Sequence, residues 1–253
     1  MHRPFLRSTV ALTAIAAAAC STGLDANTDA EVNLQLAALN SATPSASAPQ
    51  RIELGGDVIV LQRVELVMRE IELEGSDDVC SDSTGTPADT TSDDCNELEF
   101  GPMIVELPLD GDVAHAISAQ VAAGTYDEIE FKIHRPDDDS DADRAFLQAH
   151  PDFANVSIRV TGTWNGEPFT YEGQQGYEQE IDLSPPLVVA DGAADLTLMV
   201  DVGRWFVNAT GTGLVDPRLA LEGLAFESLV EHNIELSFEA FRDEDRDGHS
   251  DDD

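Results

Sequence analysis

The strongest constraint on the fold is a two-residue alternation of apolar and polar side chains that recurs along the chain. Side chains on a strand point in turn to the two faces of a sheet, so such a pattern predicts a strand with one buried and one hydrated face. The clearest example lies in the segment 127–134, where Ile129, Phe131 and Ile133 alternate with Glu128, Glu130 and Lys132. A strand of this kind needs a second layer to cover its apolar face.

Further strand candidates and their breaks follow from the same alternation. Within 57–73 the parity of the apolar residues changes near Arg69 and Glu70, which predicts a β-bulge. The stretch Trp164-Asn165-Gly166-Glu167 predicts a hairpin with a type I′ turn, because Asn-Gly readily takes positive φ angles. The other strand candidates are 32–39, 105–109, 156–160, 169–171, 177–183 and 195–202.

These eight to ten short strands, with little helix between them, define the expected fold class. They predict a mostly β protein, an antiparallel β sandwich of the immunoglobulin or transthyretin type. One helix is expected at 142–149 with Ser140 as its cap. A short C-terminal α-helix is expected at 228–242, where Val230, Ile234, Phe238 and Phe241 recur at helical spacing. The sandwich domain is therefore assigned to 31–227 and a C-terminal helix and acidic loop to 228–253.

The N-terminal segment has the features of an export signal. Arg3 and Arg7 precede an apolar run from Val10 to Ala19. Ten helical residues span about 15 Å, half of a hydrocarbon core of roughly 30 Å, so a retained membrane helix is disfavoured. Residues 1–19 are predicted to be a signal peptide.

The small residues that end this run are followed by Cys20, an order that resembles the lipobox of bacterial lipoproteins. The resemblance implies that Cys20 is lipidated, that 20–30 forms a tether, and that the membrane is a partner. It also implies an exported protein of the bacterial cell envelope, at the outer membrane or cell surface rather than the inner membrane. Ala17 stands where the family more often has Leu, and the alternative is an ordinary signal peptide cut near Ala19.

The charge of the chain excludes one class of partner. The formal net charge is −37, and Lys132 is the only lysine. Nucleic-acid binding needs clustered basic residues, so we expect no nucleic-acid partner. The acidity fits cation binding, a hydrated repulsive surface or adaptation to salt.

The cysteine count gives a second structural expectation. If Cys20 carries lipid, Cys80 and Cys95 remain as an even pair in an exported chain, which predicts a disulfide within a surface loop at 75–100. Closing a loop of this length stabilises a fold by about 3 kcal/mol in the chain-entropy model.

An aspartate-rich C-terminus is the sharpest candidate site. Alternate carboxylates followed by glycine can wrap a hard cation. The stretch resembles the first half of an EF-hand loop and the aspartate-rich repeats of thrombospondins and dockerins, which implies calcium as the cofactor. Position 12 of an EF-hand would fall at residue 254, so its bidentate glutamate is missing and the affinity would be weak, on the order of 10⁻⁴ to 10⁻³ M. The alternative is a bare acidic tail. The candidate ligands are Asp243, Asp245, Asp247, His249 and Asp251.

Two weaker candidates complete the set of possible binding sites. Asp137, Asp139 and Asp141 form an acidic loop that is a weaker metal candidate, with a solvated connection as the alternative. Trp164 and Trp205 could stack on a sugar ring, although tryptophans beside turns more often pack into a core.

Signatures of catalysis are missing from the sequence. There is no Gly-x-Ser-x-Gly elbow, no His-Glu-x-x-His and no phosphate-binding glycine loop. We therefore expect a non-enzymatic binding or structural module with a weak calcium site. A carbohydrate or small-ligand binding module and an envelope hydrolase that uses acidic residues are the alternatives.

The order of elements also resembles a group of bacterial lipoproteins that includes the domain of unknown function 4382 family. The resemblance rests on the 57–73 run, on 122–129, and on Asp201-Val202 followed by Trp205-Phe206. It implies a β-sandwich envelope protein and brings no catalytic residues.

Overall fold

A computed structural model describes residues 29–41, 50–75, 97–98, 100–190, 193–246 and 248–250. Several predicted features lie outside these residues. They are the signal peptide 1–19, the lipidation at Cys20, the Cys80 and Cys95 disulfide, and the metal candidates Asp247 and Asp251.

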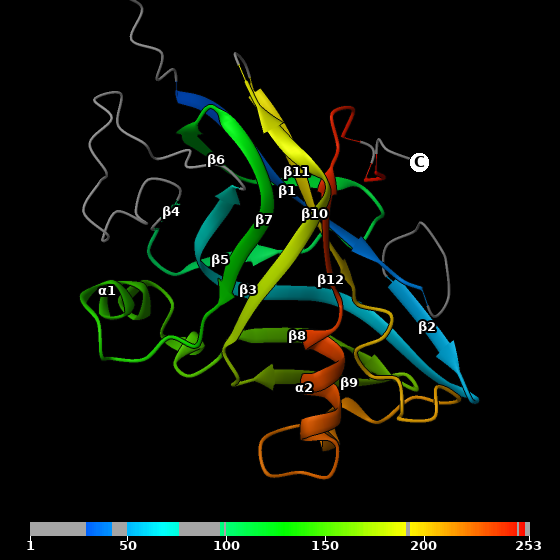
Figure 1. The fold of residues 1–253 in the computed structure, drawn as a ribbon. Coiled ribbons are helices and arrows are strands. Elements are labelled where there is room, and N and C mark those ends of the chain that lie inside the picture. Colours follow the sequence, from blue (N-terminus) through cyan, green and yellow to red (C-terminus); the bar gives the residue numbers. More distant parts are fainter. Residues whose placement is uncertain are drawn as a thin grey trace, which may run out of the picture.

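Two sheets pack face to face in a sandwich-like arrangement (Figure 1), so the predicted fold class is confirmed. In the described part of the chain, the first sheet has four strands in the order β12-β11-β1-β6. Its β1–β11 pair is parallel and its other pairs are antiparallel. The strand bounds are β1 Asp29–Leu39, β6 Val113–Ala122, β11 Ala193–Asp201 and β12 Phe238–Arg242.

Among the residues that the structure describes, the second sheet has eight strands, and it is organised around β3, which spans Asp57–Gly75. Residues 59–66 of β3 pair with β8, and residues 68–75 pair with β7. The order along the sheet is β10-β7-β3-β8-β9, and β2, β4 and β5 also pair with β3. The other bounds are β2 Gln50–Leu54, β4 Glu97–Leu98, β5 Met103–Glu106, β7 Gly124–Ile133, β8 Ile158–Trp164, β9 Glu167–Gly173 and β10 Tyr177–Val189.

Two local predictions are confirmed by the backbone. The β3–β7 register shifts between Arg69 and Ile71, and Glu70 has a φ of 57°, so the bulge lies where the apolar parity changes. The turn between β8 and β9 places Asn165 at φ 50° and Gly166 at φ 88°, as a type I′ turn requires.

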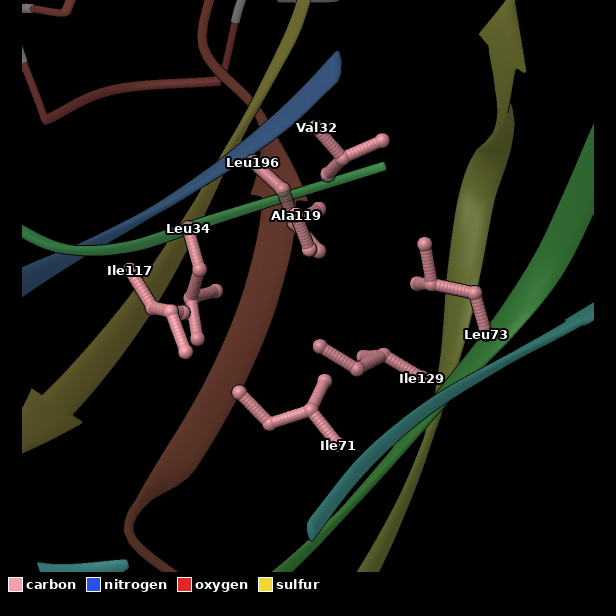
Figure 2. Close-up of a pocket in the computed structure, with 8 residues that line it drawn as sticks. All are labelled: Val32, Leu34, Ile71, Leu73, Ile117, Ala119, Ile129 and Leu196. Atoms are coloured by element: carbon pink, nitrogen blue, oxygen red, sulfur yellow. The ribbon is translucent and has the colours of Figure 1, made fainter. Parts of the chain in front are cut away.

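The core lies between the two sheets. Leu34 and Leu196 of the first sheet face Ile71 and Ile129 of the second (Figure 2). The space left between them is about 10 Å³, which has room for roughly one water molecule. Apolar packing of this kind supplies most of the driving force for folding.

The helices agree with the sequence only in part. Helix α1 spans Asp141–Ala149, and the Ser140 hydroxyl accepts a hydrogen bond from the backbone N–H of Asp143 at 3.0 Å, so the predicted cap is confirmed. Two short 3₁₀ helices lie at Pro151–Phe153 and Pro217–Leu219. No helix in the described ranges is long and apolar enough to span a membrane.

The predicted C-terminal helix at 228–242 is wrong in its second half. Helix α2 spans Glu227–Glu235, and the chain then forms β12 against β11. Pairing with the edge of β11 satisfies the backbone of β12, and the Phe238 ring packs edge-on against Phe131 with centroids 5.4 Å apart. The segment after residue 228 thus contributes a strand to the sandwich.

Candidate metal-binding face

The outward face of β10, β7 and β3 carries carboxylates in rows. Backbone register places Glu180, Glu130 and Glu72 side by side, and it places Asp182, Glu128 and Glu74 in the next row. Their side chains point away from the first sheet because their apolar neighbours in sequence fill the core. The acidic face is defined by Glu72, Glu74, Glu128, Glu130, Glu178, Glu180 and Asp182.

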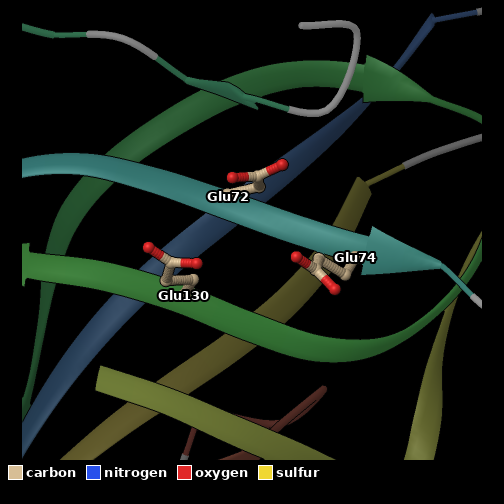
Figure 3. Close-up of side chains that lie close together, drawn as sticks. All are labelled: Glu72, Glu74 and Glu130. Atoms are coloured by element: carbon tan, nitrogen blue, oxygen red, sulfur yellow. The ribbon is translucent and has the colours of Figure 1, made fainter. Parts of the chain in front are cut away.

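The tightest group on the acidic face consists of Glu72 and Glu74 from β3 and Glu130 from β7 (Figure 3). One carboxylate oxygen from each lies within 4.8 Å of the others. Within the described part of the chain, this is the one group of three or more histidine, cysteine or acidic side chains close enough to hold a metal ion.

Among the described residues, Lys132 and Arg69 form ion pairs at one end of this face. The Lys132 ammonium lies 2.9 Å from Glu70, 3.8 Å from Glu130 and 3.7 Å from Glu178. Arg69 lies 2.9 Å from Glu70. The cations are therefore directed mainly at Glu70, the residue in the bulge.

The crowding of carboxylates raises the pKa of Glu130 to about 7. The largest cause is a hydrogen bond with Glu178, followed by burial and by repulsion from Glu178, with Glu72 adding a smaller repulsion and Lys132 opposing them. Burial and repulsion from Glu74, Glu180 and Asp182 also raise the pKa of Glu128. A proton thus offsets part of the repulsion near neutral pH.

This arrangement suits a hard divalent cation. Calcium takes oxygen ligands at about 2.3–2.6 Å, so oxygens on opposite sides of the ion lie roughly 4.8 Å apart. The three carboxylates can supply up to six oxygens between them. The paired strands β3 and β7 hold the backbones that carry them in a fixed register.

The described C-terminal residues 243–246 and 248–250 lie against the outer face of the first sheet. Asp243 is buried, and its Oδ2 accepts hydrogen bonds from Thr197 Oγ1 at 2.8 Å and from the Gly248 N–H at 3.0 Å. Arg246 Nη2 lies 3.0 Å from Asp195 Oδ1. The part of the segment that the structure describes is thus not a bare tail.

The predicted ligands in this segment are only partly in place. Asp243, Asp245 and His249 do not form a group within ligand distance among the described residues. Gly248 has a φ of 79°, the positive angle that a wrapped loop needs at this position. The backbone turn resembles the predicted loop. The Asp243 carboxylate, however, already accepts hydrogen bonds from Thr197 and Gly248.

The weaker acidic loop serves local structure. Asp137 accepts a hydrogen bond from the Asp139 N–H at 2.9 Å, and Asp141 pairs with Arg144. These aspartates do not form a metal-ligating group among the described residues.

The two tryptophans do not form a stacking face. Trp205 is 0% exposed, and its Nε1 donates to Ser237 Oγ at 2.8 Å, so the prediction that it contacts a sugar is wrong. Trp164 is half-buried and packs against the core. The indole of Trp205 is buried between the sandwich and the α2–β12 connection.

Sequence reasoning missed the acidic face, although its signal was present. The alternation places Glu128 and Glu130 on the hydrated side of one strand, and Glu72 and Glu74 follow the parity change in another. The missing information was that β3 and β7 are neighbours with Glu72 opposite Glu130.

Comparison with known proteins gives no relative for this fold or this site. No protein-family model, no curated protein and no solved structure matches the chain.

Proposed function

We propose that this chain is an exported, lipid-anchored module of the bacterial cell envelope that binds calcium on the acidic face and has no enzymatic activity. The observation that carries the calcium proposal is the approach of Glu72, Glu74 and Glu130 to within 4.8 Å. The signal-like residues 1–19 and the lipobox-like order before Cys20 support export and anchoring.

Calcium would relieve a repulsion that the fold imposes. Strand pairing keeps the backbones that carry these carboxylates side by side, so their side chains can separate only by changing rotamer. A divalent cation replaces the proton that Glu130 otherwise retains near neutral pH. Because only side-chain oxygens on an open surface take part, we expect a dissociation constant on the order of 10⁻⁴ to 10⁻³ M.

The C-terminal segment is a second candidate for the calcium site. The hydrogen bond from the Gly248 N–H to Asp243 closes the turn in the way the aspartate-rich resemblance implies. Asp245 is exposed and can be altered without touching the buried Asp243 carboxylate.

Calorimetric titration of the mature chain with calcium separates the two sites. Glu130→Gln removes one ligand of the acidic face with little change in shape, and we expect it to weaken binding at least about fivefold. Asp245→Asn tests the C-terminal segment, and Glu222→Gln removes an exposed charge that belongs to neither site. If the wild type and Glu130→Gln bind calcium with equal heats, the acidic-face proposal is contradicted. If calcium binding is lost in Asp245→Asn alone, the site lies in the C-terminal segment.

Lipidation has its own test. A Cys20→Ser variant expressed with the full signal segment should lose partition into detergent, since the thioether-linked lipid cannot form on serine. A variant that partitions like the wild type would remove the anchor from the proposal. The disulfide between Cys80 and Cys95 stays a prediction, as does the resemblance to the domain of unknown function 4382 family.

A further inference from the structure

A cavity at one end of the first sheet has a chemistry unlike that of the acidic face. Its volume is about 90 Å³, and it lies where β1 and β11 end beside the C-terminus of α2. Its wall is formed by the apolar side chains of Leu39, Met199 and Leu236, by the charged side chains of Asp201, Arg204 and Glu239, and by Ser41 and Ser237. A cavity of this size holds several water molecules, or the roughly five or six heavy atoms of a short apolar chain.

Arg204 is fixed at this cavity by one edge of its guanidinium. Its Nε lies 3.1 Å from Asp201 Oδ2 and donates to Ser41 Oγ at 3.1 Å. Asp201 is itself fixed, because its Oδ1 accepts from the backbone N–H groups of Ser41 at 3.1 Å and Gly203 at 3.2 Å. The side chain of Arg204 therefore has a defined direction.

The other edge of the guanidinium is available to a ligand. The two Nη groups of Arg204 have no hydrogen-bond or ion-pair partner among the described residues, and the side chain is 67% exposed. Two parallel N–H groups on one edge match the two oxygens of a carboxylate.

Exposed apolar side chains lie beside this guanidinium. Leu236 is 67% exposed and Leu39 is 40% exposed, and they account for two of the five large exposed hydrophobic residues in the described part of the chain. Both line the cavity, together with Met199. A ligand that covered them would gain from the removal of apolar surface from water.

We propose that this cavity binds a small monocarboxylate with a short apolar chain. The carboxylate accepts two hydrogen bonds from the Nη edge of Arg204, and the apolar chain lies on Leu39 and Leu236. Glu239 on the wall repels any carboxylate, so the two hydrogen bonds from Arg204 must outweigh this repulsion, and a second negative charge on the ligand is disfavoured further. The inference is independent of the calcium proposal, since the acidic face belongs to the second sheet and shares no residue with this cavity.

The probe is hexanoate, titrated into the isotopically labelled mature chain and followed by amide chemical shifts. We expect saturable shifts around residues 39–41, 199–204 and 236–239 with a dissociation constant on the order of 1–10 mM, typical of a ligand of this size. Hexan-1-ol lacks the carboxylate and acetate lacks the chain, so each should bind at least about fivefold more weakly.

Arginine variants supply the matched control. Arg204→Gln should weaken hexanoate binding at least about tenfold. Arg218→Gln should leave it unchanged, because Arg218 is an exposed arginine that is likewise paired with an aspartate, Asp216, but does not line the cavity. Equal weakening in both variants would show general electrostatic attraction and overturn the proposal.

Two further variants keep the test decisive if Arg204→Gln unfolds. Arg204→Lys retains the charge but cannot form the bidentate hydrogen bonds of a guanidinium. Leu236→Ser alters a residue that is mostly exposed. Each should weaken hexanoate binding about threefold or more while leaving thermal unfolding unchanged. Unchanged binding in both, or no shift with hexanoate up to about 50 mM, overturns the proposal.

Discussion

The two outer faces of the sandwich both carry carboxylates, but the groups that surround these carboxylates differ between the faces. On the first sheet, Asp195 forms an ion pair with Arg246, and Asp243 accepts hydrogen bonds from Thr197 and Gly248. On the second sheet, Glu72, Glu74 and Glu130 face one another, and the pKa of Glu130 rises to about 7. Carboxylates on one face are therefore stabilised by protein hydrogen-bond donors, whereas on the other face they crowd one another, with Lys132 as a nearby cation.

The largest effect is expected where a carboxylate is buried with donors. Asp243→Ala leaves the Thr197 hydroxyl and the Gly248 N–H without their acceptor, and it should lower the free energy of unfolding by about 3 kcal/mol. Chemical denaturation measures this change, with Asp245→Asn as the exposed control. A loss below about 0.5 kcal/mol would show that the C-terminal segment does not depend on this carboxylate.

Calcium should stabilise the acidic face and leave the first sheet's outer face as it is. With a dissociation constant near 1 mM, about 10 mM calcium raises the free energy of unfolding by about 1.4 kcal/mol. The proton on Glu130 competes with calcium, so the affinity should fall about tenfold between about pH 8 and about pH 6. Magnesium, which demands stricter octahedral geometry, serves as the comparison ion. If calcium stabilises Glu130→Gln as much as the wild type, Glu130 is not a calcium ligand and the contrast drawn between the two faces is wrong.

The pH dependence of stability tests the repulsion itself. The pKa of Glu130 is raised in the folded state from an ordinary value of 4.5, so the folded chain binds more protons between about pH 4.5 and pH 7. Stability from this group is present below about pH 4.5 and is lost as the pH rises through about 7. Its side chain is 16% exposed, and we expect a loss of about 1 kcal/mol after screening by nearby water. Denaturation curves of the wild type should show this fall, and Glu130→Gln should flatten it relative to Glu222→Gln.

The smallest effect concerns the single lysine. Lys132 lowers the pKa of Glu130 and adds positive charge to the acidic face. Lys132→Gln should therefore raise the pKa of Glu130 further and, above about pH 8, tighten calcium binding about threefold. Calorimetry at that pH measures the affinity, and weaker calcium binding in this variant would contradict the assigned electrostatics.

The sequence predicts the strands whose two faces differ strongly in polarity. Alternation locates β7, the parity change locates the bulge at Glu70, and Asn165-Gly166 locates a hairpin. Strand β6 was missed because its alanines, Ser118 and Gln120 give little contrast between faces. For the residues of β12 the sequence predicts helix, because Phe238 and Phe241 fit helical spacing, and pairing with the open edge of β11 favours the strand.

The candidate site depends on information that a single strand does not contain. Each glutamate of the acidic face can be assigned to a hydrated side from its own neighbours in sequence. Which glutamates meet depends on the pairing of β3 with β7 and on the one-residue shift at Glu70 that brings Glu72 opposite Glu130. Long-range register of this kind follows from the packing of the whole sheet.

The parallel pairing of β1 with β11 has a mechanical consequence. β1 is the first described element of the chain and lies inside the first sheet, between β11 and β6. A pull on residue 29 directed along the strand loads the hydrogen bonds to both neighbours at the same moment, whereas a terminal edge strand would peel away bond by bond. This end of the described domain is thereby expected to resist a pulling force applied along β1.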